Sequence, residues 1–311
     1  MKRLLLGIGS AALFLSACTP SATPSGEKLR VAATIYPLAY LAEHVGGDLV
    51  SVDLLTPAGI EPHEFEPTPA IIARMLEADV LLLNGAGIDA WAETAAAEAK
   101  EHGIAVLTMA DNLTLHEVEE EEHEEGDEHE HEHPHGSLDP HVWLDPVLMQ
   151  NETELIAQLL AERDSAHADT YHRQADASVE KLKTLDRVMR EGLASCTNRK
   201  AIVAHDAFGY FSERYALDLI PIAGISPEEE PSPKQLASLV ELARAQNIHT
   251  IFFETLASPK LAQTLAKEVG AQTLVLNPIE GLTDEDRQAG KDYDALMRDN
   301  LANLRTGLRC P

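Results

Sequence analysis

Short apolar runs alternate with amphipathic segments in the first half of this chain, and the same alternation recurs in the second half. This pattern restricts the folds that the chain can adopt. The runs are rich in β-branched residues, as buried strands are, and the segments between them show the three-and-four spacing of helices. The expected strands are residues 29–35, 49–55, 80–83 and 104–108, then 201–204, 217–222, 250–253 and 273–276. The expected helices include residues 68–77, 90–100, 234–246, 259–269 and 291–307. The alternation predicts an α/β protein of two lobes with mostly parallel sheets.

A long segment without proline or glycine, residues 147–191, separates the two halves and keeps helical spacing. A single helix of this length would extend about 70 Å at 1.5 Å per residue, which exceeds the size of either lobe. We therefore expect an N-terminal lobe (28–146), one long linking helix (147–194) and a C-terminal lobe (195–311). The alternative is two shorter helices with a bend near residues 164–169.

The N-terminus has the features of an export signal. A positively charged start precedes apolar residues 4–15, a stretch too short to span a bilayer comfortably. We expect residues 1–17 to be removed as a signal peptide. Residues 15–18, Leu-Ser-Ala-Cys, resemble the lipobox of bacterial lipoproteins, in which Cys18 carries a lipid. Residues 18–27 would then form a flexible tether. An ordinary signal peptide with an incidental cysteine is the alternative.

The net charge of the chain limits its possible binding partners, and its cysteine content bears on whether it forms a disulfide. The formal charge of -28 argues against nucleic acid as a partner. Besides Cys18, the chain has only Cys196 and Cys310. Because disulfides persist outside the cytosol, we expect these two to be bonded, with two free thiols as the alternative.

A segment of histidine and acidic residues lies toward the end of the first half of the chain, shortly before residue 139. Residues 116–133 contain 11 Asp or Glu and no Lys or Arg. The histidines of this segment, with one just beyond it, are His116, His123, His129, His131, His133 and His135. Such a composition cannot bury apolar surface and indicates a solvated loop. Its interleaved imidazoles and carboxylates also suit weak, repeated binding of zinc, so we expect an accessory metal-binding role.

Three other histidines stand at strand ends or helix starts, where open α/β sheets gather their ligands. They are His63, His141 and His205. A single histidine in a loop is more often a surface or capping residue than a ligand. Three imidazoles plus one carboxylate, however, would complete the tetrahedral shell of Zn2+. Copper and nickel would also bind such a set by raw affinity.

Four motifs resemble those of the solute-binding lipoproteins of zinc and manganese ABC importers. They are residues 62–69 (PHEFEPTP), 139–146 (DPHVWLDP), 205–211 (HDAFGYF) and 224–236. The resemblance runs from about residue 28 to the C-terminus. It implies two α/β lobes joined by a long helix, with one metal at the lobe interface. Histidine at position 205, where manganese binders have Glu, and the His-rich loop both resemble the zinc branch.

The resemblance also suggests the fourth ligand. A carboxylate from the last lobe, or a water in its place, completes the shell in that family, and the matching residue here is Glu280. A solvent-facing Glu280 is the alternative. Glu254, Glu64 and Glu66 are candidates for accepting a hydrogen bond from the far nitrogen of a ligand imidazole.

These observations predict a monomeric, membrane-anchored receptor outside the cytoplasm that passes zinc to a cognate ABC permease in the inner membrane. A lipid-anchored zinc buffer or adhesin without a transport role is the alternative. A zinc hydrolase would need an open coordination position and a general base. Glu64 could supply the base, but no His-Glu-x-x-His pair occurs, so we do not expect an enzyme.

Overall fold

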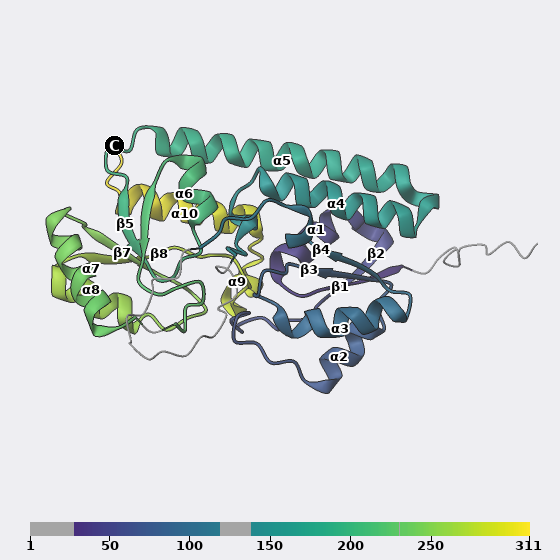
Figure 1. Cartoon of the computed structure of the whole chain (residues 1–311). Helices are drawn as coiled ribbons and strands as arrows, with labels where there is room; N and C mark the ends of the chain where they lie inside the picture. Colours follow the sequence, from purple (N-terminus) through teal and green to yellow (C-terminus); the bar gives the residue numbers. More distant parts are fainter. Residues whose placement is uncertain (1–27, 119–137, 230) are drawn as a thin grey trace, which may run out of the picture.

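The structure is a computed structural model that describes residues 28–118, 138–229 and 231–311 (Figure 1). The expected signal peptide, the tether with Cys18, and five loop histidines (His123, His129, His131, His133 and His135) lie outside the described residues. Among the described helices, none combines the length and the apolar character that a membrane span requires.

The N-terminal lobe is built on a four-stranded parallel sheet in the order β2-β1-β3-β4. Its strands are β1 (Leu29–Ala33), β2 (Val50–Leu54), β3 (Val80–Leu83) and β4 (Ala105–Thr108). Its helices are α1 (Tyr36–Gly46), α2 (Pro69–Leu76) and α3 (Ala90–Glu101). Alternate residues of β3 belong to two different apolar clusters, one with α1 and one with α2 and α3. Both faces of the sheet are therefore covered, as parallel sheets require.

The C-terminal lobe repeats this design with a parallel sheet in the order β6-β5-β7-β8. Its strands are β5 (Lys200–Val203), β6 (Asp218–Pro221), β7 (Thr250–Phe253) and β8 (Gln272–Val275). Its helices are α6 (Gly209–Tyr215), α7 (Pro233–Ala245), α8 (Lys260–Val269), α9 (Asp284–Ala289) and α10 (Tyr293–Gly307). The expected fold class, two α/β lobes with parallel sheets, is confirmed.

Two helices, not one, occupy the segment between the lobes. They are α4 (Leu148–Arg163) and α5 (Ala168–Ala194), and they pack side by side along the same edge of the molecule (Figure 1). The expectation of one uninterrupted helix over residues 147–194 is therefore wrong, and the alternative with a bend near 164–169 is correct. The carboxylate of Asp164 accepts hydrogen bonds from His167 Nδ1 (2.7 Å) and from the hydroxyl of Tyr171 (2.9 Å). These two bonds hold the turn between α4 and α5.

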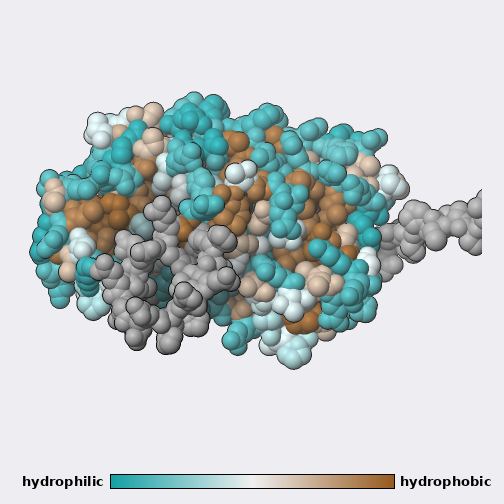
Figure 2. Space-filling view, in the orientation of Figure 1, coloured by the Kyte–Doolittle hydropathy of each residue, from teal (hydrophilic) through white to brown (hydrophobic). Residues whose placement is uncertain are grey.

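One long helix nevertheless joins the lobes, because α5 extends over both of them (Figure 1). It contacts α1 of the first lobe and α6 and α10 of the second. Its outward residues form exposed ion pairs, such as Lys183 with Glu180 and Arg187 with Glu191. Hydrophilic residues accordingly predominate along the upper edge of the molecule (Figure 2).

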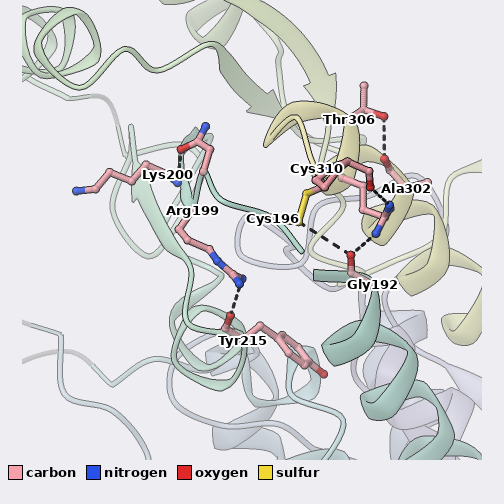
Figure 3. Close-up of a disulfide and its surroundings, with 11 residues drawn as sticks. Gly192, Cys196, Arg199, Lys200, Tyr215, Ala302, Thr306 and Cys310 are labelled. Atoms are coloured by element: carbon pink, nitrogen blue, oxygen red, sulfur yellow. Dashed lines mark hydrogen bonds between the residues drawn. A yellow bond between two sulfur atoms is a disulfide. The ribbon is translucent and has the colours of Figure 1, made fainter. Parts of the chain in front are cut away.

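A disulfide joins Cys196, just after α5, to Cys310, just after α10, as expected (Figure 3). The two residues are 114 positions apart in sequence. Chain-entropy models give about 4–5 kcal/mol for a loop of this size, as an upper figure. In addition, the guanidinium of Arg305 donates a hydrogen bond to the carbonyl oxygen of Gly192. The end of the chain is thus fastened to the end of the linking helix.

Candidate metal centre

The four predicted ligand residues all follow strands. His63 lies between β2 and α2, and His141 lies in the connection that follows β4. In the second lobe, His205 follows β5 and Glu280 follows β8. Parallel strands end at a common edge of a sheet, so the residues that follow them gather there. Two of the predicted ligand residues come from the first half of the chain and two from the C-terminal lobe.

The structure brings these four side chains together. Their candidate ligand atoms all lie within 4.8 Å of one another, and no other such group of three or more His, Cys, Asp or Glu occurs in the described part of the chain. Nε2 of His141 is 3.3 Å from Nε2 of His63 and 3.3 Å from Nε2 of His205. Oε1 of Glu280 lies 3.7 Å from the Nε2 of His63, 3.4 Å from that of His141 and 3.3 Å from that of His205. One ion between them could contact all four.

Burial makes this cluster costly without a cation. His141, His205 and Glu280 are buried, and the side chain of His63 is 7% exposed. Oε1 of Glu280 has no hydrogen-bond partner among the described residues, and its distances to the imidazoles are long for charge-assisted bonds. A buried carboxylate oxygen without a partner is strongly unfavourable. A divalent cation at this point would satisfy it and the three Nε2 lone pairs at once.

Carboxylates fix two of the imidazoles from behind. Oδ1 of Asp139 accepts hydrogen bonds from the backbone nitrogen of His141 (2.9 Å) and from its Nδ1 (2.8 Å). Oε1 of Glu254 lies 2.5 Å from Nδ1 of His205. A proton held on Nδ1 leaves Nε2 as the free acceptor that faces the site.

The expected partners of the imidazoles were only partly correct. Glu254 lies beside Nδ1 of His205, as predicted for a residue that accepts a hydrogen bond from a ligand imidazole. Glu64 and Glu66 are instead exposed at the surface. The sequence reasoning missed Asp139, although its position two residues before His141 was a usable signal. It also missed Glu61, whose carboxylate accepts hydrogen bonds from the backbone nitrogens of His63 (3.1 Å) and Glu64 (3.0 Å). These two bonds fix the turn that presents His63.

The electrostatics of the site favour an ionised Glu280. Burial alone would raise the pKa of this carboxyl group, but the three imidazoles outweigh it and hold the pKa well below its usual range. Burial likewise lowers the pKa of His63. Burial also acts to lower the pKa of His141 and His205, but the carboxylates beside them reverse it, so both pKa values are raised. Burial and the nearby Glu280 raise the pKa of Glu61 to about 8.

The first histidine of the acidic segment, His116, is described and lies outside the four-residue cluster. Its Nε2 is 3.0 Å from the carboxylate of Glu213, and its ring stacks on Tyr210 with centroids 4.1 Å apart. Its backbone nitrogen donates to the Tyr210 hydroxyl, which in turn donates to the carbonyl oxygen of Asp139. His116 thus connects the beginning of the acidic segment to the residues behind His141.

Comparisons with known proteins agree with this geometry. A family model described as "Zinc-uptake complex component A periplasmic" matches residues 31–307. The high-affinity zinc uptake system protein ZnuA of Bacillus subtilis is 38% identical over 309 residues, which covers 98% of this chain and 97% of that protein. The zinc-binding lipoprotein AdcA of Streptococcus pneumoniae is 36% identical over 98% of this chain, which spans only 61% of AdcA. The crystal structure of the Zn(II)-bound ZnuA-like domain of that AdcA superposes with a TM-score of 0.75 at 34% identity, covering 91% of this chain and 99% of that one.

Proposed function

The chain belongs to the ZnuA family of zinc-uptake binding proteins, the binding components of ABC importers, and we propose that its Zn2+ is held by His63, His141, His205 and Glu280. It is a solute-binding protein and not an enzyme. The observation that supports this ligand set is the convergence of three imidazole nitrogens and one carboxylate oxygen between the lobes. Three nitrogens and one oxygen in a tetrahedral shell suit zinc better than magnesium, calcium or manganese.

The division of the ligands between the lobes explains how the ion is held and released. His63 and His141 precede α5, whereas His205 and Glu280 belong to the C-terminal lobe. Either pair alone leaves half of a tetrahedral shell empty. Tight binding therefore requires both lobes in their present arrangement, and a displacement of one pair from the other releases the ion. A bound ion in turn holds the lobes together.

Export, anchoring and transfer form the remaining part of the proposal. Residues 1–17 direct the chain out of the cytoplasm, Cys18 carries the lipid, and the bound zinc passes to an ABC permease. The family description, which names a periplasmic component of a zinc-uptake complex, supports this assignment, as do the lipoproteins among its relatives. Deletion of the gene should impair growth in zinc-poor medium, and added zinc should restore it. A zinc buffer or adhesin without a transport role would leave that growth unchanged.

A competition titration with a zinc chelator tests the proposed ligands. The unaltered protein should hold one tight Zn2+, and His205→Ala should weaken that binding strongly. His172→Ala is the matched control, because His172 is exposed on α5 and should leave the affinity unchanged. Tight binding that persisted undiminished in His205→Ala would contradict the ligand assignment.

A further inference from the structure

Glu280 lies on a segment without regular structure between β8 and α9, so other contacts must fix its position. We propose that Asn277 and Asn300 form a clamp that positions Glu280, and that this clamp helps to set the affinity for zinc. The inference rests on the proposed zinc site and adds two residues that do not touch the ion.

The first half of the clamp is the amide side chain of Asn300 on α10. This residue is 2% exposed. Its Oδ1 accepts a hydrogen bond from the backbone nitrogen of Asn277 (2.8 Å), and its Nδ2 donates one to the carbonyl oxygen of Asn277 (2.7 Å). One buried amide therefore satisfies both backbone groups of a single residue. The chain that leaves β8 is fastened to α10 at this point.

The second half is the side chain of Asn277 itself, which is 5% exposed. Its Oδ1 accepts a hydrogen bond of 2.8 Å from the backbone nitrogen of Ile279. Ile279 has a φ of 59°, a left-handed conformation that β-branched residues strongly disfavour. Backbone strain of this kind persists only where the surrounding contacts impose it. Asn277 supplies such a contact directly before Glu280.

Glu280 is held from its other side by the N-terminal lobe. Its carbonyl oxygen accepts a hydrogen bond from the backbone nitrogen of Tyr36 (3.2 Å), at the beginning of α1. With the backbone fixed on both sides, the carboxylate of Glu280 faces the three imidazoles. If Ile279 returned to an ordinary negative φ, the backbone before Glu280 would rotate and carry this carboxylate away from the imidazoles.

The test is the zinc affinity of Asn277→Ala, measured by chelator competition in two backgrounds. In the otherwise unaltered protein, the change should weaken binding about tenfold, as loss of a residue that orients a ligand commonly does. In the Glu280→Ala background it should have little further effect, because the group that it positions is already absent. Asn277→Ser should weaken zinc binding less than Asn277→Ala does, since a hydroxyl can still accept the hydrogen bond from the backbone nitrogen of Ile279.

A matched control separates positioning from general loss of stability. The hydroxyl of Thr250, also buried, donates to the carbonyl oxygen of Gly307 (2.9 Å) and likewise joins the second sheet to α10. Thr250→Val should lower the melting temperature of the metal-free protein without changing its zinc affinity. Should Asn277→Ala fail to fold, Asn300→Asp provides the second test, because it keeps the acceptor and removes the donor. It should weaken zinc binding in the unaltered background and not in Glu280→Ala.

Two results would overturn the clamp. The first is an Asn277→Ala protein whose zinc affinity is unchanged. The second is a loss of zinc affinity on Asn277→Ala that is equally large in the otherwise unaltered protein and in Glu280→Ala. Failure of the zinc site itself would differ, because His205→Ala and Glu280→Ala would then both leave the tight ion in place.

Discussion

The indole nitrogen of Trp143 donates a hydrogen bond of 2.7 Å to the carbonyl oxygen of Pro278. Trp143 lies two residues after His141, and Pro278 lies two residues before Glu280, so this bond connects the segments that carry two proposed ligands. The hydroxyl of Tyr293, on α10, donates to the carbonyl oxygen of Trp143 (2.6 Å) and strengthens the same junction. The proposed zinc site is thus built into the contact between the lobes.

Trp143→Phe should therefore weaken both folding and zinc binding. The change leaves the Pro278 carbonyl without its donor and shrinks a fully buried side chain, which should lower the free energy of unfolding by about 2–4 kcal/mol. Urea denaturation and chelator competition measure the two effects. Trp91→Phe is the control, because the Trp91 indole nitrogen has no hydrogen-bond partner among the described residues. An unchanged zinc affinity in Trp143→Phe would show that the junction does not support the site.

Glu254→Gln should weaken zinc binding by about 10- to 100-fold, although Glu254 is not a proposed ligand. The change removes the negative charge that faces Nδ1 of His205 and that keeps the proton on this nitrogen. Chelator competition gives the affinity, and Glu241→Gln, an exposed position on α7, is the control. Equal affinities in the two variants would exclude a role for Glu254 in orienting His205.

Removal of the acidic His-rich segment should leave the tight zinc in place. Glu117 pairs with Leu138 in an isolated antiparallel bridge, so a two-glycine linker can replace residues 119–137. The shortened protein should bind one tight ion and lose the weaker ones. We expect the affinity for the weaker ions to be on the order of micromolar, because binding each ion costs the conformational entropy that the composition of this segment predicts. The shortened protein should also bind zinc more slowly at low zinc and low salt, because the acidic residues that attract cations have been removed with the segment. Loss of the tight ion would instead place this segment in the primary site.

Glu152 should make the protein less stable as pH rises. This residue is fully buried on α4, neither carboxylate oxygen has a hydrogen-bond partner among the described residues, and burial raises its pKa to about 8. Between the unfolded pKa of about 4.5 and this value, the folded state holds a proton that the unfolded state has released. Its contribution to stability is complete below pH 4.5 and declines, by at most about 1.4 kcal/mol per pH unit, as pH rises to 8.

Glu152→Gln removes this titration, so its stability relative to the unaltered protein should increase from pH 5 to pH 8. Denaturation of the metal-free proteins across this range measures the difference. Glu154→Gln, an exposed position on the same helix, should show no such trend. A difference between Glu152→Gln and the unaltered protein that did not vary with pH would mean that Glu152 ionises normally.

The strands could be predicted from the sequence, because buried parallel strands are short, continuous apolar runs. All eight lie within two residues of the expected bounds, and β3 and β7 match them fully. Helix α1 was missed for a physical reason. Residues 36–42 are all buried, so the first two turns of the helix have no polar face and read as a continuous apolar run. The turn at Asp164 was expected only as the alternative to a single helix, because Asp and Ser disfavour a helix only weakly. The packing of α4 against α5 decides between the two.

The proposed ligands could also be predicted, because each follows a strand or lies near a helix start in a recognisable motif. The residues that position them were harder to identify. Glu254 was identified because it follows a strand, whereas Asp139 was missed although it lies two residues before His141. Asn300 lies 23 residues from Asn277, the residue that it holds. The contact between Asn300 and Asn277 depends on how α10 packs beside β8, which no local pattern in the sequence records.

The most direct test of the zinc site is a crystal structure of the zinc-loaded protein with diffraction data on both sides of the zinc absorption edge. The proposal predicts one strong anomalous peak between the lobes, about 2.0–2.2 Å from Nε2 of His63, His141 and His205 and from a carboxylate oxygen of Glu280. The proposal would be contradicted if one or more of the three imidazoles did not contact the peak, or if the only strong peak lay elsewhere on the chain.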